Sequence, residues 1–247
     1  MQKREIISRL QKAIASASGE PVPGTPGTIP CEPLGRLFTR GLPRAALIEC
    51  LYRGCGCGTL ALWMARAASF DGRAIVIIDR ARRFYAPPAA RMGINPEQLI
   101  VVQPENKTDE IWALDQSIRC RAIAAVLWRG GKLGVRHIRR LQLACENNES
   151  LGLLLRPDAL RSELAAPAIR LLVEAVCPEE NLAATSATAI EHSPFSRARL
   201  RISRLRGNPF LTDDSVELEI DDETGTLFEA LPLPLVSRGT PGATQRE

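Results

Sequence analysis

The sequence predicts an α/β protein in which helices flank a mostly parallel central sheet, and three features of the chain support this prediction. Short apolar runs alternate with longer segments that place apolar residues at helical spacing. The run R-A-I-V-I-I-D at residues 73–79 has an unbroken β-branched centre, which is typical of a strand buried on both faces. A glycine-rich turn at residues 54–58 lies between an apolar strand and a helical pattern. Strands that alternate with helices form parallel sheets, and ligands collect at the carboxyl ends of their strands.

The individual elements follow from periodicity along the chain. Strands are expected at residues 46–52, 73–79, 99–102, 123–128 and 151–155, and helices at residues 60–68, 87–92, 109–119 and 135–146. Between residues 161 and 176 a helical pattern is broken by Pro167, and two interpretations stay open: a helix, or a strand that pairs with the next strand. Residues 197–206 alternate arginines with apolar residues, which predicts a half-buried strand with an arginine face.

The two ends of the chain differ in composition from the core, which is expected to span residues 31–206. Residues 2–17 form an amphipathic helical pattern, and the Pro/Gly-rich residues that follow, up to residue 30, form a linker. The helix either docks on its own core or binds a partner protein, and its candidate contacts are the aliphatic residues Ile6, Ile7, Leu10 and Ile14. Residues 207–247 are expected to contain an acidic hairpin around Thr224 and Gly225, followed by a disordered end.

Composition bounds the class of protein. The chain has 247 residues, of which 45% are hydrophobic, so it can bury one substantial core. Its net charge of +4 is only mildly basic, so an anionic partner would have to meet local clusters of charge. No apolar run is long enough to span a membrane, and the N-terminus lacks the apolar stretch of a signal peptide. Seven cysteines, an odd number, suit a reducing compartment, and we expect a cytoplasmic protein.

The glycine-rich turn has the architecture of a phosphate-binding loop without its chemistry. The motif G-x-x-x-x-G-K-[ST] supplies a lysine to the phosphates and a hydroxyl to Mg²⁺. With Gly58 as the last glycine, the lysine position holds Thr59, the hydroxyl position Leu60 and the first-glycine position Arg53, while Gly54 and Gly56 lie between them. We therefore predict a degenerate P-loop and no bound cofactor, although backbone N–H groups at a helix N-terminus can hold an anion without a lysine.

Positive charge is concentrated in the middle of the chain. Residues 119–140 contain seven Lys or Arg residues and no Asp or Glu. Glycines and cations follow the fourth predicted strand, and such a segment suits contacts to the phosphates of single-stranded DNA. The candidate DNA-binding residues are Arg129, Lys132, Arg136, Arg139 and Arg140. The competing interpretation is a solvated helix face. Arg80, Arg82 and Arg83 form a second cluster, and the arginine strand at 197–206 forms a third, which could also meet an acidic protein partner.

The cysteines and tryptophans are weaker candidates for a functional site. Cys50, Cys55 and Cys57 have no second pair of Cys or His ligands nearby in the sequence, so we predict no metal site and interpret these cysteines as small apolar residues. Trp63 and Trp112 are expected in the core or in a subunit interface. Trp128, at a strand end beside Arg129, is expected to be a surface contact.

The order of these segments resembles a known family. The runs G-L-P-R-A-A-L-I-E, M-G-I-N-P-E-Q-L-I-V-V-Q-P and W-A-L-D-Q-S-I-R, together with the glycine loop, are similar to the RecA-type recombinase core. More closely they resemble the ImuA family, RecA-like accessory proteins of the bacterial translesion-synthesis mutasome. The resemblance covers residues 34–206 and implies a RecA-like core.

This resemblance also implies where an ATPase would keep its catalytic groups. A catalytic glutamate would lie two residues after Asp79, where the chain has Ala81. A magnesium-side aspartate would close the fourth strand, where Trp128 and Arg129 stand, and a phosphate-sensing glutamine would follow the fifth strand, where Arg156 and Pro157 stand. Phosphoryl transfer depends on such positioned groups, so we expect no ATPase activity and assign no catalytic residue.

Three functions remain open at this point. The first is a non-catalytic RecA-like adaptor in SOS-induced, mutagenic translesion synthesis, whose implied partners are an ImuB-like Y-family polymerase homologue and RecA. An error-prone replicative-type polymerase and the sliding clamp would be reached indirectly. The second is an ATP-dependent RecA-type recombinase or regulator with an atypical loop. The third is a SulA-type inhibitor of cell division, because such inhibitors are also small RecA-like proteins without a P-loop.

Overall fold

The computed structural model describes residues 28–29, 34–38, 41–163, 167–176, 198–206, 215–221 and 226–230. The strands of its main sheet are β3 (Ala46–Arg53), β4 (Ala74–Ile78), β5 (Leu99–Val102), β6 (Ile123–Arg129), β7 (Leu151–Pro157), β8 (Ile169–Val176), β9 (Ala198–Arg206), β10 (Ser215–Ile220) and β11 (Leu227–Glu229). The helices are α2 (Cys57–Ala68), α3 (Pro87–Arg91), α4 (Lys107–Arg119) and α5 (Val135–Asn148), with short 3-10 turns η2 (Pro96–Gln98) and η3 (Asp158–Leu160). A small antiparallel pair joins β1 (Thr28–Ile29) to β2 (Leu42–Pro43).

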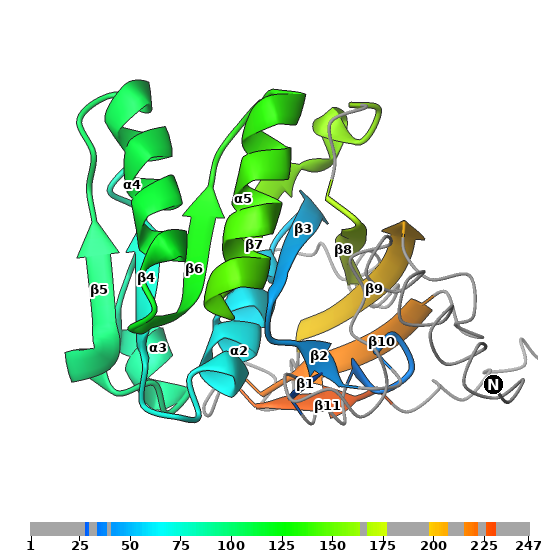
Figure 1. Ribbon diagram of the computed structural model, residues 1–247. Helices are drawn as coiled ribbons and strands as arrows, with labels where there is room; N and C mark the ends of the chain where they lie inside the picture. The colour runs from blue at the N-terminus through cyan, green and yellow to red at the C-terminus, as the bar shows by residue number, and fades with distance from the viewer. Residues whose placement is uncertain are drawn as a thin grey trace, which may run out of the picture.

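Within the described residues the main sheet has nine strands in the order β11-β10-β9-β8-β3-β7-β6-β4-β5 (Figure 1). Between β8 and β5, each pair of adjacent strands is parallel. The strands from β8 to β11 pair antiparallel and extend the sheet at its other side. The predicted fold class, an α/β protein with a mostly parallel sheet flanked by helices, is confirmed.

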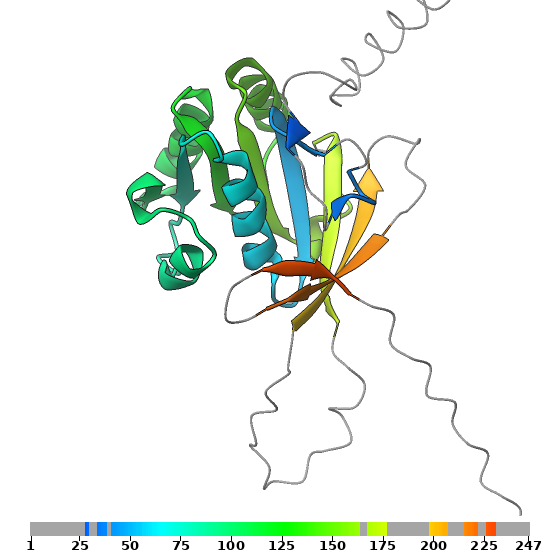
Figure 2. The same ribbon diagram turned by 90° about the horizontal axis from the view of Figure 1, so that it is seen from below.

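Helices cover both faces of the parallel part of the sheet (Figure 2). Residues of α4 and α5 pack with Val76, Val126 and Leu154 in one hydrophobic cluster, and residues of α2 pack with Ile77 and Leu127 in the other. Since side chains alternate between the faces of a strand, a strand covered on both sides must be apolar at every position. This explains the continuous apolar runs of β4 and β6.

Most predicted elements lie where periodicity placed them, and a side-chain cap explains the earlier start of one helix. Helix α4 begins at Lys107, two residues before its expected start, because the Asn106 side chain accepts a hydrogen bond from the backbone N–H of Asp109 at 3.0 Å. The segment after Pro167, for which two interpretations were open, forms a strand at 169–176 that pairs with β3 and with β9.

The arginine strand and the acidic segment form one ladder. Arg201 and Glu217 are opposite each other in the β9–β10 register and form an ion pair at 2.7 Å, and Arg199 pairs in the same way with Glu219. The acidic partner of this arginine face therefore belongs to the same chain, which corrects the hypothesis of an acidic partner protein there. In the acidic segment, β10 pairs antiparallel with β11. Thr224, Gly225 and the predicted helix at 2–17, with Ile6, Ile7, Leu10 and Ile14, lie outside the described residues.

Candidate functional site

The glycine loop connects β3 to α2 at the carboxyl edge of the sheet. Gly54 and Gly56 have φ angles of 88° and 86°, a left-handed conformation that favours glycine. A Cβ atom on Gly56 would lie 2.3 Å from Cδ2 of Leu200, a buried residue of β9. The glycine at position 56 is therefore required by backbone geometry and by close packing against β9, independently of any phosphate.

Arg53, in the position of the first glycine, ties the loop to its neighbours. Its guanidinium donates hydrogen bonds to Asp158 Oδ2 and Glu174 Oε1, both at 2.6 Å. The hydrogen bond to Asp158, followed by the attraction of that carboxylate and of Glu174, raises the pKa of Arg53. The arginine side chain thus joins the end of β3 to β8 and to the turn after β7.

Arg129 and Trp128 point to opposite faces at the end of β6. The Arg129 guanidinium lies 5.4 Å from the centre of the Tyr52 ring, and its Nη2 lies 3.5 Å from where a Cβ on Gly58 would stand. Trp128 is only 1% exposed and donates its indole N–H to Glu110 Oε1 at 3.0 Å. The prediction of Trp128 as a surface contact is wrong, because this residue shares the face of Val126, which α4 covers.

The loop after β4 carries the second basic cluster. The Asp79 carboxylate accepts a hydrogen bond from the backbone N–H of Phe84 at 2.7 Å, which fixes the path of the loop. Arg82, with a φ of 54°, and Arg83 are exposed, as is Tyr85 at 68%. Arg80 instead donates to Glu110 Oε2 at 2.9 Å. Ala81, in the position of the catalytic glutamate, is exposed and carries no functional group.

A buried ionic network underlies the loop that follows β6. Glu49 of β3 is 0% exposed and accepts hydrogen bonds from both Arg156, also 0% exposed, and Arg170. Arg156 also pairs with Glu163 and donates its Nε hydrogen to the carbonyl oxygen of Gly131 at 2.9 Å. The residue in the position of the phosphate-sensing glutamine is therefore a structural cation that anchors the loop.

Sequence reasoning did not find this network. The signal available was Glu49 itself, a lone carboxylate in the apolar run A-L-I-E-C-L-Y, because a charge in such a strand must be paired when it is buried. Its partners, Arg156 and Arg170, are 107 and 121 residues away in the chain.

The candidate DNA-binding residues fall into two groups. Arg129 and Lys132 lie at the carboxyl end of β6; the Lys132 side chain is 78% exposed, with its Nζ 4.0 Å from Glu163 Oε1. Because Ile78 and Trp128 are partners in the parallel ladder of β4 and β6, the loop with Arg82 and Arg83 emerges next to them. These four cations and Tyr85 are called the edge surface below.

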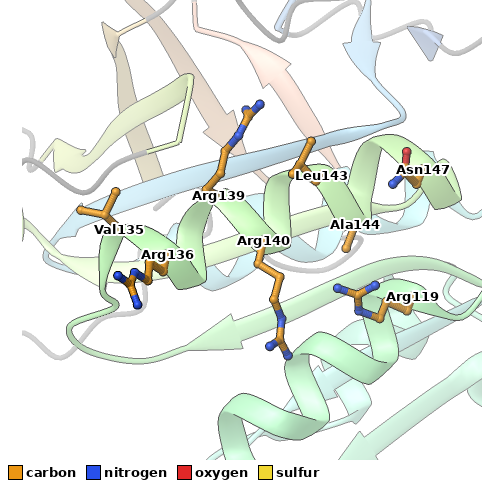
Figure 3. A pocket seen from close by; sticks show the side chains of 8 residues that line it. All are labelled: Arg119, Val135, Arg136, Arg139, Arg140, Leu143, Ala144 and Asn147. Atoms are coloured by element: carbon orange, nitrogen blue, oxygen red, sulfur yellow. The ribbon is translucent and has the colours of Figure 1, made fainter.

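The other group lies on α5. Arg136, Arg139 and Arg140 line a groove together with Arg119 of α4 (Figure 3). Arg140 donates its Nε hydrogen to Asp115 Oδ1 at 2.7 Å, and Arg119 donates to Asp115 Oδ2 at 2.9 Å. Burial opposes ionisation of Asp115, but the hydrogen bonds from Arg140 and Arg119 outweigh it and hold the pKa of this carboxyl below its ordinary value. Arg140 therefore joins α5 to α4 rather than standing free.

Two of the three cysteines of the loop region are core residues. Cys50 and Cys57 are buried and Cys55 is exposed. A hydrogen bond with Cys57, together with burial, raises the pKa of the Cys50 thiol well above its ordinary value, so the thiol stays protonated. Among the residues that the structure describes, no group of three or more His, Cys, Asp or Glu side chains could hold a metal ion. None of the described helices is long and apolar enough to cross a membrane.

Comparison with known proteins identifies the architecture. No family model matches the sequence, and no curated protein sequence matches it. Among solved structures, the crystal structure of the RadB recombinase aligns with 81% of this chain and 97% of its own, with a TM-score of 0.57 and 14% sequence identity. The chain has a RecA-like fold. At this identity the likeness concerns the fold alone, and the resemblance to ImuA proteins stays a prediction.

Proposed function

We propose that this RecA-like chain is a non-catalytic adaptor in DNA damage tolerance, which binds partner proteins and single-stranded DNA. The observation that carries the proposal is the replacement of the phosphate-loop chemistry by structural contacts. Arg53 is held by two carboxylates, Leu60 is fully buried, and Arg129 occupies the mouth of the loop where a magnesium-side carboxylate would be needed.

The physical consequence concerns the transition state of phosphoryl transfer. Such a reaction is accelerated almost entirely by positioned charge: a lysine, a bound Mg²⁺ and a group that orients the nucleophile. Thr59 and Ala81 supply none of these, and Arg156 is committed to a buried network with Glu49 and Glu163. We therefore expect no turnover of ATP.

The edge surface supports the DNA part of the proposal. Arg82, Arg83, Arg129 and Lys132 present guanidinium and ammonium groups that suit phosphates, and these contacts carry no sequence preference. Tyr85, 68% exposed and two residues after Arg83 in the chain, suits stacking on an unpaired base.

The partner proteins come from the family resemblance. An ImuB-like Y-family polymerase homologue and RecA are the direct partners that we propose, in the cytoplasm, during SOS-induced translesion synthesis. The error-prone replicative-type polymerase and the sliding clamp would be reached through the ImuB-like protein.

Three measurements on the purified chain test this function. ATP hydrolysis should not exceed the background of a Gly58→Trp variant, and a turnover that this substitution abolishes would contradict the non-catalytic proposal. Fluorescence anisotropy with a labelled oligothymidine of about 30 nucleotides should show binding that weakens with salt. Co-purification with an ImuB-like protein and with RecA tests the adaptor role, and capture of neither would refute it.

A further inference from the structure

The outer side of α5 carries a groove of about 560 Å³ to which the proposed function assigns no ligand (Figure 3). One wall comes from α4 through Arg119, and the rest comes from α5 between Val135 and Asn147. That span of helix is about 18 Å long, which matches roughly three turns of a second helix.

The charge of this groove has a single sign. Four arginines line it, Arg119, Arg136, Arg139 and Arg140, and none of the lining residues is acidic. Within the part of the chain that the structure describes, Arg136 and Arg139 are exposed and have no carboxylate within 4.0 Å. Asp115 lies beneath the groove and is only 3% exposed. The groove therefore presents more positive charge than the described residues neutralise.

Two of the arginines are held in position before any partner arrives. Arg140 and Arg119 both bond to Asp115, yet their side chains remain 54% and 47% exposed. An arginine that is anchored through Nε on one side keeps other N–H donors for a second carboxylate. Because their rotamers are already restricted, less conformational entropy is lost when a ligand binds.

The groove also has an apolar ridge. Val135 is 65% exposed and Leu143 is 40% exposed, so both offer apolar surface that a partner can bury. They are eight residues apart on α5, about 12 Å along its axis, with Arg139 between them on the same side of the helix.

We propose that this groove binds an acidic amphipathic helix of a partner protein. Aliphatic side chains of the incoming helix, seven or eight residues apart, would lie on Val135 and Leu143. Acidic side chains between and beside them would pair with Arg136, Arg139 and the outward donors of Arg119. This inference rests on the partner-binding part of the proposed function and names the surface and the chemistry of the partner.

Nucleic acid fits this groove less well than it fits the edge surface. None of the residues that line the groove is aromatic, whereas Tyr85 is exposed at the edge surface. Exposed aliphatic groups gain free energy by burial against other apolar groups and gain little from phosphates. Arg136 and Arg139, first predicted to bind DNA, are therefore assigned to a protein partner.

The test uses synthetic peptides of about 16 residues with leucines on one helical face. One peptide carries glutamates on both flanks, a second carries lysines at the same positions, and a third is a scrambled form of the first. Anisotropy of the labelled peptides is measured with the full chain. We expect the acidic peptide to bind at least about tenfold more tightly than the other two.

Variants then locate the binding surface. Arg136→Glu/Arg139→Glu should weaken binding of the acidic peptide about tenfold or more, and Val135→Ser/Leu143→Ser about fivefold. Arg91→Glu, an exposed arginine of α3 outside the groove, is the matched control and should change binding less than twofold. Circular dichroism and melting temperature confirm that each variant is folded.

Oligothymidine binding, measured on the same variants, separates this inference from the DNA part of the proposed function. The groove variants should retain DNA affinity within about threefold. If the acidic peptide binds no better than the lysine or scrambled peptide, or if the charge-reversed variant binds it equally well, the inference is overturned. If the charge-reversed variant lost affinity for oligothymidine while its affinity for the acidic peptide stayed the same, the groove would instead be a nucleic-acid site.

Discussion

Replacing Glu49 by glutamine should destabilise the protein more than any other conservative change in the sheet. The Glu49 carboxylate is fully buried and accepts hydrogen bonds from Arg156 and Arg170, whose side chains are 0% and 9% exposed. Glu49→Gln keeps the shape of the side chain but removes its charge. The amide oxygen of the glutamine can still accept from one guanidinium, but its NH2 group faces the other. Among the described residues, Arg156 would retain Glu163 and Arg170 would retain the carbonyl oxygens of residues 160 and 161.

The magnitude follows from the desolvation of the charges left behind. Removing one partner of a buried ion pair costs about 3–5 kcal/mol, because an uncompensated charge remains in a medium of low polarity. The total free energy of unfolding of a domain is about 5–15 kcal/mol. At about 2–4 °C per kcal/mol for a domain of this size, the melting temperature should fall by roughly 6–20 °C.

Urea and thermal unfolding followed by circular dichroism measure this loss. The control is Glu217→Gln, which breaks the exposed pair with Arg201 and should cost less than about 1 kcal/mol. Hydrogen exchange adds a local readout, because Arg156 also holds the carbonyl oxygen of Gly131, so amides at 130–134 and 158–163 should exchange faster.

Two outcomes would refute the reasoning on this network. One is a Glu49→Gln protein within about 1 kcal/mol of the original, which would mean that the two guanidiniums find water or another anion. The other concerns the triple replacement Glu49→Leu/Arg156→Met/Arg170→Met. Since apolar residues of similar volume can replace a buried ionic group without loss, this variant should be more stable than Glu49→Gln, and a lower stability would contradict the explanation.

Three further predictions concern the loop, the groove and the edge surface. Gly56→Ala should lower the free energy of unfolding by more than about 1 kcal/mol in urea, because φ is 86° and the new Cβ meets Leu200; an unchanged midpoint would contradict the packing argument. Asp115→Asn should lower the free energy of unfolding by its full amount above about pH 4, and this loss should shrink as pH falls through the lowered pKa of Asp115. The reason is that a lowered carboxyl pKa means that only the ionised form stabilises the fold. A loss that is independent of pH would contradict this prediction. Arg129→Ala/Lys132→Ala should reduce the slope of log affinity for oligothymidine against log salt concentration by about one for each phosphate that the variant no longer binds. An unchanged slope would show that these two residues do not contact DNA.

Local sequence determined the elements of this protein and the class of its fold. The strand at residues 99–102 has the predicted bounds, and helix α5 begins at the predicted residue and ends two residues later than predicted, at Asn148. These features depend on periodicity within a few residues, which the sequence displays directly. The missing lysine and hydroxyl of the glycine loop are also local facts, visible as Thr59 and Leu60.

Tertiary structure alone decided which charges are neutralised and which remain available. Arg199 and Arg201 are matched by glutamates of β10, because an antiparallel register sets them opposite each other. Arg156 is buried and paired, whereas Arg136 and Arg139 stay exposed on α5. Trp128 and Arg129 are neighbours in the chain, yet the pleat of β6 sends one under α4 and the other to the mouth of the glycine loop. Electrostatic energy depends on distances in space, so the local sequence around Glu49 signals a buried charge but does not show that its partners are residues more than 100 positions away.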